Sequence, residues 1–280
     1  MNTPVYLSRP AVTSALGSGL QTHIHALLNP SADSPLAFSE QWVRGKSYAF
    51  GAVGETLREF SGGLPAEHRS RNNQLLWHAL AQIESDIHAA VARYGSHRIA
   101  VVIGTSTSGA DENIPLFEHV AHGGGWADKP FNQLQHTMNA PAEFVAQVYG
   151  LQGLRYTVST ACTSGARALI SAARLLRANL ADAAAFVMTR DADFGGKMQL
   201  LGYGASSDAY HMSSPRPDGL GAAQAFQAAL KHARLSPQDI GWINLHGTGT
   251  KHNDSMESRA VAQVFGCQTP CTSTKPSTGH

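Results

Sequence analysis

The stretch "YTVSTACTSGARALISAARLL" (residues 156–176) contains a β-branched run that changes into a helical pattern within a few residues. The first part belongs to a predicted strand over 155–161, and the second to a predicted helix over 163–180. Further strands are predicted at 98–106, 183–188 and 241–247, and further helices at 72–95, 220–236 and 254–266. Short apolar strands that alternate with long helices indicate an α/β fold with a largely parallel sheet.

The helix predicted over 163–180 has an apolar face. Helical spacing places five residues along it: Leu169, Ile170, Ala173, Leu176 and Leu180. We expect this face to be buried against the sheet. Stretches rich in glycine and proline at 121–130 and 213–221 predict surface loops.

Composition excludes several classes of protein. The chain of 280 residues is long enough for one large domain or two coupled halves. It carries 21 Lys and Arg against 20 Asp and Glu, with no block of like charge, which argues against nucleic acid as a partner. Three cysteines, an odd number, favour a reducing compartment over a disulfide framework. Because neither a secretory signal nor a membrane-length apolar run is found, we expect a soluble cytoplasmic protein with no membrane partner.

Cys162 lies at the turn between the strand and the helix. In α/β sheets, functional groups gather where a strand ends and the next helix begins. The unpaired N–H groups and the positive dipole end of a helix N-terminus stabilise a thiolate, the nucleophilic form of cysteine. The alternative is that Cys162 is a small residue that fills a gap in the core.

Two later stretches offer partners for a reactive cysteine. "NLHGTGTKHND" (244–254) places His246 at a strand end, in a turn of glycines and hydroxyl residues that includes Thr248 and Thr250. "TSTKPSTGH" (272–280) contains Lys275 and His280. The alternative for either histidine is a structural or solvated side chain. Cys267 and Cys271 lack the spacing of a zinc site, and we expect neither a metal nor another cofactor.

Three stretches, "STACTSGA", "HGTGTKHND" and "STKPSTGH", occur in the order typical of the β-ketoacyl-acyl carrier protein synthases of the thiolase superfamily. The chain resembles this family over most of its length, least over residues 1–95. The resemblance implies a thiolase-like α-β-α-β-α sandwich of two similar halves. It also implies a dimer and a decarboxylative Claisen condensation of a cysteine-bound acyl group with malonyl-acyl carrier protein.

The resemblance also implies roles for individual residues. Cys162 would accept the acyl group, and its backbone N–H would contribute to an oxyanion hole. His246 and His280 would stabilise the enolate formed on decarboxylation, and Lys275 and Glu257 would orient the second histidine. The matching family positions of Thr248 and Thr250 contact the pantetheine arm of the substrate. The set of one cysteine and two histidines is similar to that of the elongating branch, in fatty acid or polyketide-type synthesis.

The sequence departs from the family pattern at two places. Only "TRDADFGGKMQ" separates two strands that the family joins by a longer segment, and the sequence given stops at His280. We therefore expect a half over 1–190 that carries the nucleophile and a partial second half over 191–280 that carries the histidines.

These departures leave alternatives open. The chain could be a non-catalytic or partner-dependent subunit that pairs with a related ketosynthase-like chain instead of forming a homodimer. It could also be a hydrolase or a degradative thiolase-like enzyme that acts on coenzyme A thioesters. The first alternative predicts that the chain needs a partner to fold. The second predicts a preference for coenzyme A thioesters over carrier-protein thioesters as donors.

Overall fold

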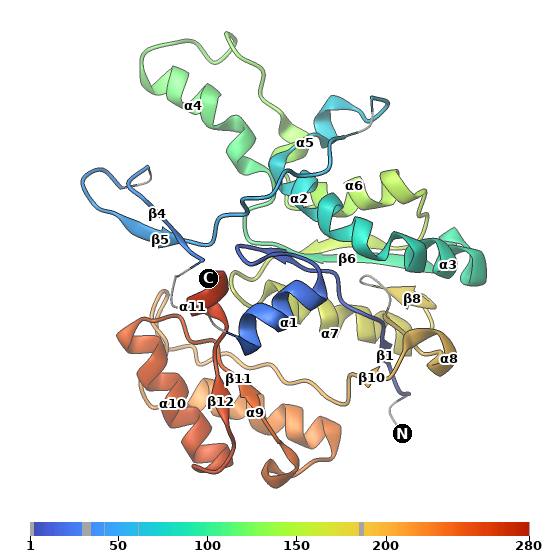
Figure 1. Cartoon of the computed structure of the whole chain (residues 1–280), viewed down its shortest axis with the longest axis vertical. Helices are drawn as coiled ribbons and strands as arrows, with labels where there is room; N and C mark the ends of the chain where they lie inside the picture. Colours follow the sequence, from blue (N-terminus) through green and yellow to red (C-terminus); the bar gives the residue numbers. More distant parts are fainter. Residues whose placement is uncertain (1–2, 30–34, 42, 61, 185–187, 280) are drawn as a thin grey trace. The chain divides into compact units, whose positions relative to one another are not determined.

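The computed structural model describes residues 3–29, 35–41, 43–60, 62–184 and 188–279, and Figure 1 shows their arrangement. The chain forms two compact units. Unit 1 comprises residues 1–13 and 55–199, and unit 2 comprises residues 14–54 and 200–280. The predicted halves 1–190 and 191–280 stay a prediction.

One sheet forms the centre of unit 1. Over the described residues it has six strands in the order β10-β1-β9-β8-β6-β7. β6 is parallel to β7 and β8, but the pairs β8–β9, β9–β1 and β1–β10 are antiparallel. The strands are β1 (Tyr6–Leu7), β6 (Ile99–Gly104), β7 (Arg155–Val158), β8 (Ala183–Ala184), β9 (Met188–Thr189) and β10 (Met198–Gln199). The expectation of a largely parallel sheet is therefore right around β6 and wrong in the other half.

The antiparallel pairing of β8 with β9 results from a short connection. A parallel return needs a crossover of a dozen or more residues, and only three separate β8 from β9. The single strand predicted over 183–188 is therefore wrong: β8 and β9 pair with each other, and residues 185–187 lie outside the described residues.

β6 is the longest strand of unit 1, and all of it but the last residue is buried. Its residues Ile99–Ile103 are all at most 7% exposed, as expected for a strand covered on both faces. Figure 1 shows α3 (Glu84–Tyr94) and α6 (Ala140–Tyr149) on one side of β6 and α7 (Ser164–Arg177) on the other. The sheet and helices enclose a core that includes Ile87, Phe144 and Leu151.

The helices of unit 1 follow the sequence patterns with local changes. The helix predicted over 72–95 is α2 (Arg71–Leu80), a 3₁₀ turn η2 (Ala81–Ile83) and α3, which ends at Gly95 with φ 82°. The Ser70 side chain caps α2 by accepting a hydrogen bond from the Asn73 N–H. The remaining elements are α4 (Ile114–Ala121), α5 (Gln133–His136), α8 (Ala192–Gly195), η1 (Ala66–His68), η3 (Ser96–Arg98) and η4 (Ala110–Asn113).

The buried face of α7 differs from the predicted one. Ile170, Ala173 and Leu176 are buried as expected, whereas Leu169 is 39% and Leu180 55% exposed. Among the buried residues of α7, Ala172 lies four positions after Ala168, and Leu176 lies four positions after Ala172 and three after Ala173. Small alanine side chains let the helix axis approach the sheet closely, so the contact face is the alanine stripe rather than the leucine-rich one.

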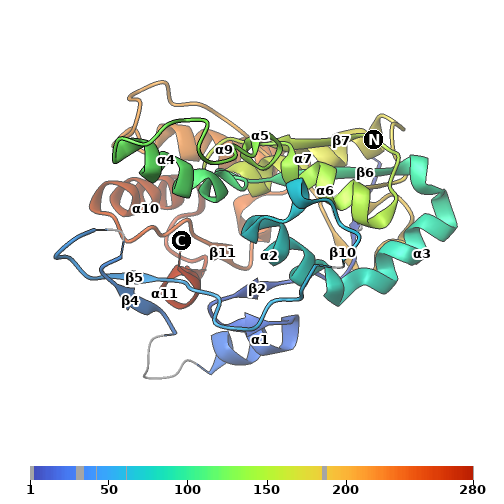
Figure 2. The ribbon, with the colours of Figure 1, turned by 90° about the horizontal axis from the view of Figure 1, so that it is seen from above.

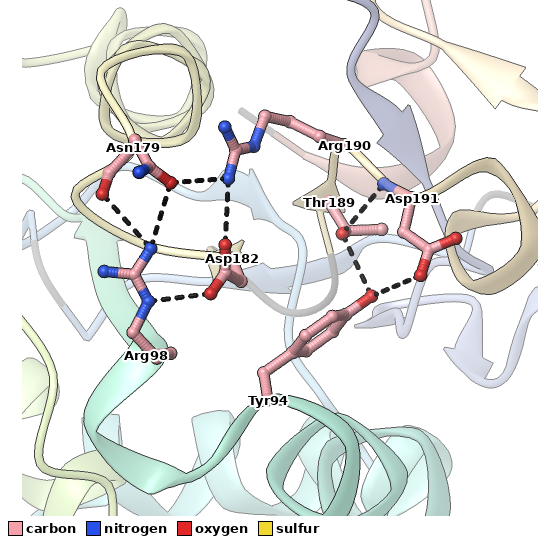
Figure 3. Close-up of polar contacts among 7 residues, drawn as sticks. All are labelled: Tyr94, Arg98, Asn179, Asp182, Thr189, Arg190 and Asp191. Carbon is pink, nitrogen blue, oxygen red and sulfur yellow. Dashed lines mark hydrogen bonds and ion pairs between the residues drawn. The ribbon is translucent and has the colours of Figure 1, made fainter.

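Charged side chains link the residues that flank β8 and β9 (Figure 3). Asp182 accepts hydrogen bonds from Arg98 Nε at 2.7 Å and from Arg190 at 2.9 Å, and Arg98 and Arg190 both also bond Asn179. These bonds, chiefly the one from Arg98, hold the pKa of Asp182 below its usual value. Asp182, directly before β8, and Arg190, directly after β9, are thereby linked to the segment that precedes β6.

The segment from Thr189 to Asp191, which leads from β9 into α8, is linked by hydrogen bonds to the end of α3 (Figure 3). The Tyr94 hydroxyl donates to Asp191 at 3.2 Å and lies 3.3 Å from Thr189 Oγ1. Burial is the main cause that raises the pKa of Tyr94 above its usual value. Arg93 also forms an ion pair with Asp191. Thr189, at the end of β9, and Asp191, at the start of α8, thus both contact the last residues of α3.

Unit 2 is built around two packed helices and short strand pairs. α9 (Leu220–Ala233) packs against α10 (Lys251–Phe265), with the rings of Phe226 and Phe265 5.3 Å apart. β11 (Ile243–Asn244) and β12 (Cys271–Thr272) are parallel, and β4 (Ala37–Ser39) and β5 (Tyr48–Phe50) form the antiparallel pair seen in Figure 2. The other elements are β3 (Gly17–Ser18), α1 (Leu20–Leu28), η5 (Pro237–Asp239) and α11 (Lys275–Thr278), and β2 (Thr13–Ser14) spans the boundary of the units.

Candidate active site

Cys162 lies in the turn between β7 and α7, where the sequence placed it. β7 ends at Val158 and α7 begins at Ser164. Cys162 is exposed and is not in a disulfide, so the alternative of a small core residue is wrong. The preceding residue, Ala161, has a φ of 52°, in the left-handed region that non-glycine residues rarely adopt. The chain thus makes a sharp turn immediately before the thiol.

His246 lies in a corresponding turn of unit 2, between β11 and α10. Gly247 and Gly249 both have positive φ, 49° and 74°, which glycine adopts without strain. A side chain at Gly247 would also meet Ser273 Oγ at 2.5 Å, so the chain passes close to the residues after β12. Thr248 and Thr250 hydrogen-bond each other through their hydroxyls at 2.9 Å.

Glu257 fixes the backbone of this turn. The residue is in α10 and only 8% exposed. Its two carboxylate oxygens accept hydrogen bonds from the N–H of His246 at 2.6 Å and of Gly247 at 2.8 Å. A buried carboxylate satisfied by two backbone donors is a strong local constraint. Glu257 therefore holds the turn at His246. The orientation of His280 by Glu257 stays a prediction, because His280 lies outside the described residues.

Lys275 contacts the imidazole of His246. Its Nζ lies 3.3 Å from His246 Nδ1 and donates a short hydrogen bond to the His246 carbonyl. An ammonium group has donors only, so Nδ1 is assigned as the acceptor. A neutral imidazole then carries its proton on Nε2, which makes Nε2 the donor atom of the ring. Sequence reasoning missed this contact because the two residues are 29 positions apart in the chain.

The predicted site residues are divided between the units. Cys162 belongs to unit 1, whereas His246, Thr248, Thr250, Glu257 and Lys275 belong to unit 2. The meeting of the thiol with the imidazoles stays a prediction.

Metal-binding clusters and membrane spans are two further features that bear on function. Across the described ranges, no three His, Cys, Asp or Glu residues gather in an arrangement that could hold a metal ion. In the same part of the chain, no helix has the length and apolar character to cross a membrane.

Family models match both parts of the chain. The model described as "Beta-ketoacyl synthase, N-terminal domain" matches residues 66–189, and "Beta-ketoacyl synthase, C-terminal domain" matches residues 198–280. Residues 190–197 alone lie between the two matches. This interval lies between β9 and β10.

Curated relatives carry related names. The chain is 28% identical to "Putative polyketide beta-ketoacyl synthase 1" of Streptomyces virginiae, with 71% of this chain and 63% of the relative covered. It is 43% identical to 3-oxoacyl-[acyl-carrier-protein] synthase 2 of Synechocystis over 96 residues, which cover 33% of this chain and 23% of the relative. The chain thus spans less than two thirds of the length of these relatives.

Solved structures extend the likeness to the whole fold. One chain of a ketosynthase in complex with its chain length factor from Xenorhabdus doucetiae matches with a TM-score of 0.89 and 35% identity, covering 99% of this chain and 79% of that one. A chain of the ishigamide ketosynthase/chain length factor matches with a TM-score of 0.83 at 22% identity, covering 100% of this chain and 82% of that one, which supports the fold alone. The expected thiolase-like α/β fold is confirmed, and the chain belongs to the β-ketoacyl synthase family of condensing enzymes.

Proposed function

We propose that this protein catalyses the decarboxylative Claisen condensation of a Cys162-bound acyl group with malonyl-acyl carrier protein. The observation that carries the proposal is the exposed thiol of Cys162 at the sharp turn before α7, in a chain of the β-ketoacyl synthase family. An exposed cysteine thiol in the turn before a helix can act as an acyl-accepting nucleophile. Fatty acid or polyketide-type synthesis is the setting that the relatives' names support.

In the first half-reaction, the Cys162 thiolate attacks the carbonyl of an acyl-carrier thioester. The carbonyl oxygen becomes an oxyanion, which the Cys162 N–H stabilises. When the oxyanion collapses, the bond between the acyl carbon and the carrier sulfur breaks. The carrier leaves as a thiolate that takes up a proton, and the acyl group remains on Cys162.

In the second half-reaction, malonyl-carrier loses carbon dioxide. The electron pair of the broken carbon–carbon bond stays on the remaining thioester and forms an enolate. The Nε2–H of His246, kept as a donor by Lys275, stabilises the enolate oxygen together with His280. The enolate carbon attacks the acyl-Cys162 carbonyl, the carbon–sulfur bond breaks, and Cys162 returns to its thiolate form. Thr248 and Thr250 would contact the pantetheine arm that carries the malonyl group.

Trapping of the acyl intermediate tests this proposal. The protein is incubated with an acyl-carrier thioester, and its peptides are examined by mass spectrometry. We expect an acyl adduct on Cys162 and its loss in Cys162→Ala, with His246→Ala retaining the adduct but losing malonyl decarboxylation by about 100-fold or more. Absence of any adduct on Cys162 would refute the catalytic role. A coenzyme A thioester as a parallel donor separates a carrier-dependent synthase from a degradative thiolase-like enzyme.

A second candidate function is that of a partner-dependent subunit. β7 is the last strand of the main sheet over the described residues, and an open edge strand can pair with a strand of another chain. The 35% identical structure is that of a ketosynthase in complex with its chain length factor. Purification of the chain alone and with a related ketosynthase-like chain, with the mass measured by light scattering, distinguishes a homodimer from a heterodimer.

A further inference from the structure

The turn before Cys162 contains a residue whose conformation needs support from its surroundings. Ala161 has a φ of 52°, which is disfavoured for a residue with a Cβ. Such conformations persist where neighbouring contacts determine them, and they cluster at functional sites. The question is therefore which side chain holds this turn.

Ser164 makes the contacts that hold it. This residue begins α7 and is 4% exposed. Its Oγ accepts a hydrogen bond from the Thr160 N–H at 2.9 Å and donates to the Ala161 carbonyl at 2.6 Å. The Ser164 N–H donates to the same carbonyl at 3.0 Å. One side chain thus bridges the backbone on both sides of the strained residue.

The Ala161 carbonyl matters because of the group to which it is bonded. It forms one planar trans peptide unit with the N–H of Cys162, so the two groups point in opposite directions. Two hydrogen bonds that fix the carbonyl toward α7 therefore fix the direction of the Cys162 N–H as well. That N–H is the donor assigned above to the oxyanion.

β6 sets the position of Ser164 itself. A Cβ added at Gly104 would lie 2.5 Å from the Ser164 carbonyl oxygen and 2.7 Å from the Gly165 nitrogen. The end of β6 therefore contacts the first turn of α7 at a distance that only glycine permits. The Thr105 carbonyl is also 3.4 Å from Ser164 Oγ. Contacts from the end of β6 and the residue after it therefore restrict the position of the Ser164 hydroxyl at the start of α7.

We propose that Ser164 is a positioning residue that aims the Cys162 N–H at the oxyanion formed during acyl transfer. The inference rests on the proposed function, in which Cys162 is the nucleophile. It predicts that loss of the hydroxyl impairs reactions that pass through an oxyanion and spares reactions of the thiol that do not.

Two reactions of Cys162 test this separation. Acylation by an acyl-pantetheine thioester passes through a tetrahedral oxyanion, whereas alkylation by iodoacetamide displaces iodide and forms no oxyanion. Both rates are measured at Cys162 by peptide mass spectrometry, with Cys267, also exposed, as an internal reference for alkylation. For Ser164→Ala we expect acylation to fall by about tenfold or more and alkylation to change by less than about threefold.

The matched control is Ser171→Ala. Ser171 is on the same helix, and its hydroxyl hydrogen-bonds Tyr156 at 2.6 Å, away from the Cys162 turn. Ser171→Ala should leave the acylation rate and the alkylation rate of Cys162 unchanged. Ser164→Thr keeps a hydroxyl and should restore acylation to within about threefold of the unmodified protein. An equal loss of both reactions in Ser164→Ala, or no loss in either, overturns the inference.

A further variant covers the case in which Ser164→Ala does not fold. In the double variant Ser164→Ala and Ala161→Gly, glycine adopts the positive φ without strain, and the hydroxyl is still absent. It should fold and lose acylation selectively, and a double variant that acylates at the normal rate contradicts the inference. If the unmodified protein forms no acyl-Cys162, the proposed function fails together with the inference. If the unmodified protein forms acyl-Cys162 and the Ser164 variants form it at the same rate, the inference alone fails.

Discussion

The turns at Cys162 and His246 have the same local plan but are held by different forces. Each follows a strand, contains a residue with positive φ and leads into a helix. A neutral hydroxyl and a close backbone contact with β6 hold the Cys162 turn, whereas a buried carboxylate and an ammonium group hold the His246 turn. The stability of the Cys162 turn should therefore depend mainly on side-chain volume, and the stability of the His246 turn mainly on charge.

Removal of the carboxylate from the His246 turn should have the largest effect on stability. Glu257→Ala leaves the N–H groups of His246 and Gly247 without their acceptor in a buried place. We expect the free energy of unfolding to fall by about 3 kcal/mol, measured by urea denaturation. Glu257→Gln keeps one acceptor oxygen and should lose about half as much. A loss within error for Glu257→Ala would show that the carboxylate does not hold the turn.

Added volume should break the Cys162 turn. Gly104→Ala places a methyl group against the backbone of Ser164 and Gly165, so the start of α7 must move. We expect a loss of about 2 kcal/mol in the free energy of unfolding and slower acylation of Cys162.

Gly165→Ala is the matched control for added volume. A Cβ at Gly165 has no heavy atom within 4 Å among the described residues. Because alanine favours a helix over glycine, this variant should be unchanged or more stable by about 0.5 kcal/mol. Equal losses in the two variants would mean that contact with β6 does not define the turn.

A smaller effect is expected at Asp182, the residue directly before β8, where charge again holds the backbone. Hydrogen bonds from Arg98 and then Arg190 lower its pKa in the folded state. A lowered folded-state pKa gives stability that is present above the unfolded pKa of about 3.9 and is lost as the pH falls through the folded value. Asp182→Asn should cost about 1 kcal/mol at pH 7 and weaken the loss of stability below pH ~4. Asp111→Asn, at an exposed position, is the control, and identical pH profiles for the two variants would contradict the role of Asp182.

Local sequence patterns predict the main strand of unit 1 and the helix that follows Cys162. The run Ile99–Ile103 is apolar without alternation, and it forms the strand buried on both faces. The helix after Cys162 begins within one residue of its predicted start. Periodicity failed at Leu169, because the sheet selects the closest-packing face rather than the most apolar one. It failed at Leu180 because α7 ends at Arg177, before that position.

The sequence by itself determined the order of the three motifs, the family they indicate and the placement of Cys162 and His246 at strand ends. Only the tertiary structure decided that half of the sheet is antiparallel, that Glu257 and Lys275 contact the turn at His246, and that Ser164 holds the turn before Cys162. The physical reason is that periodicity and turn chemistry act over a few residues. A hydrogen bond between residues 29 positions apart depends on how the intervening chain packs.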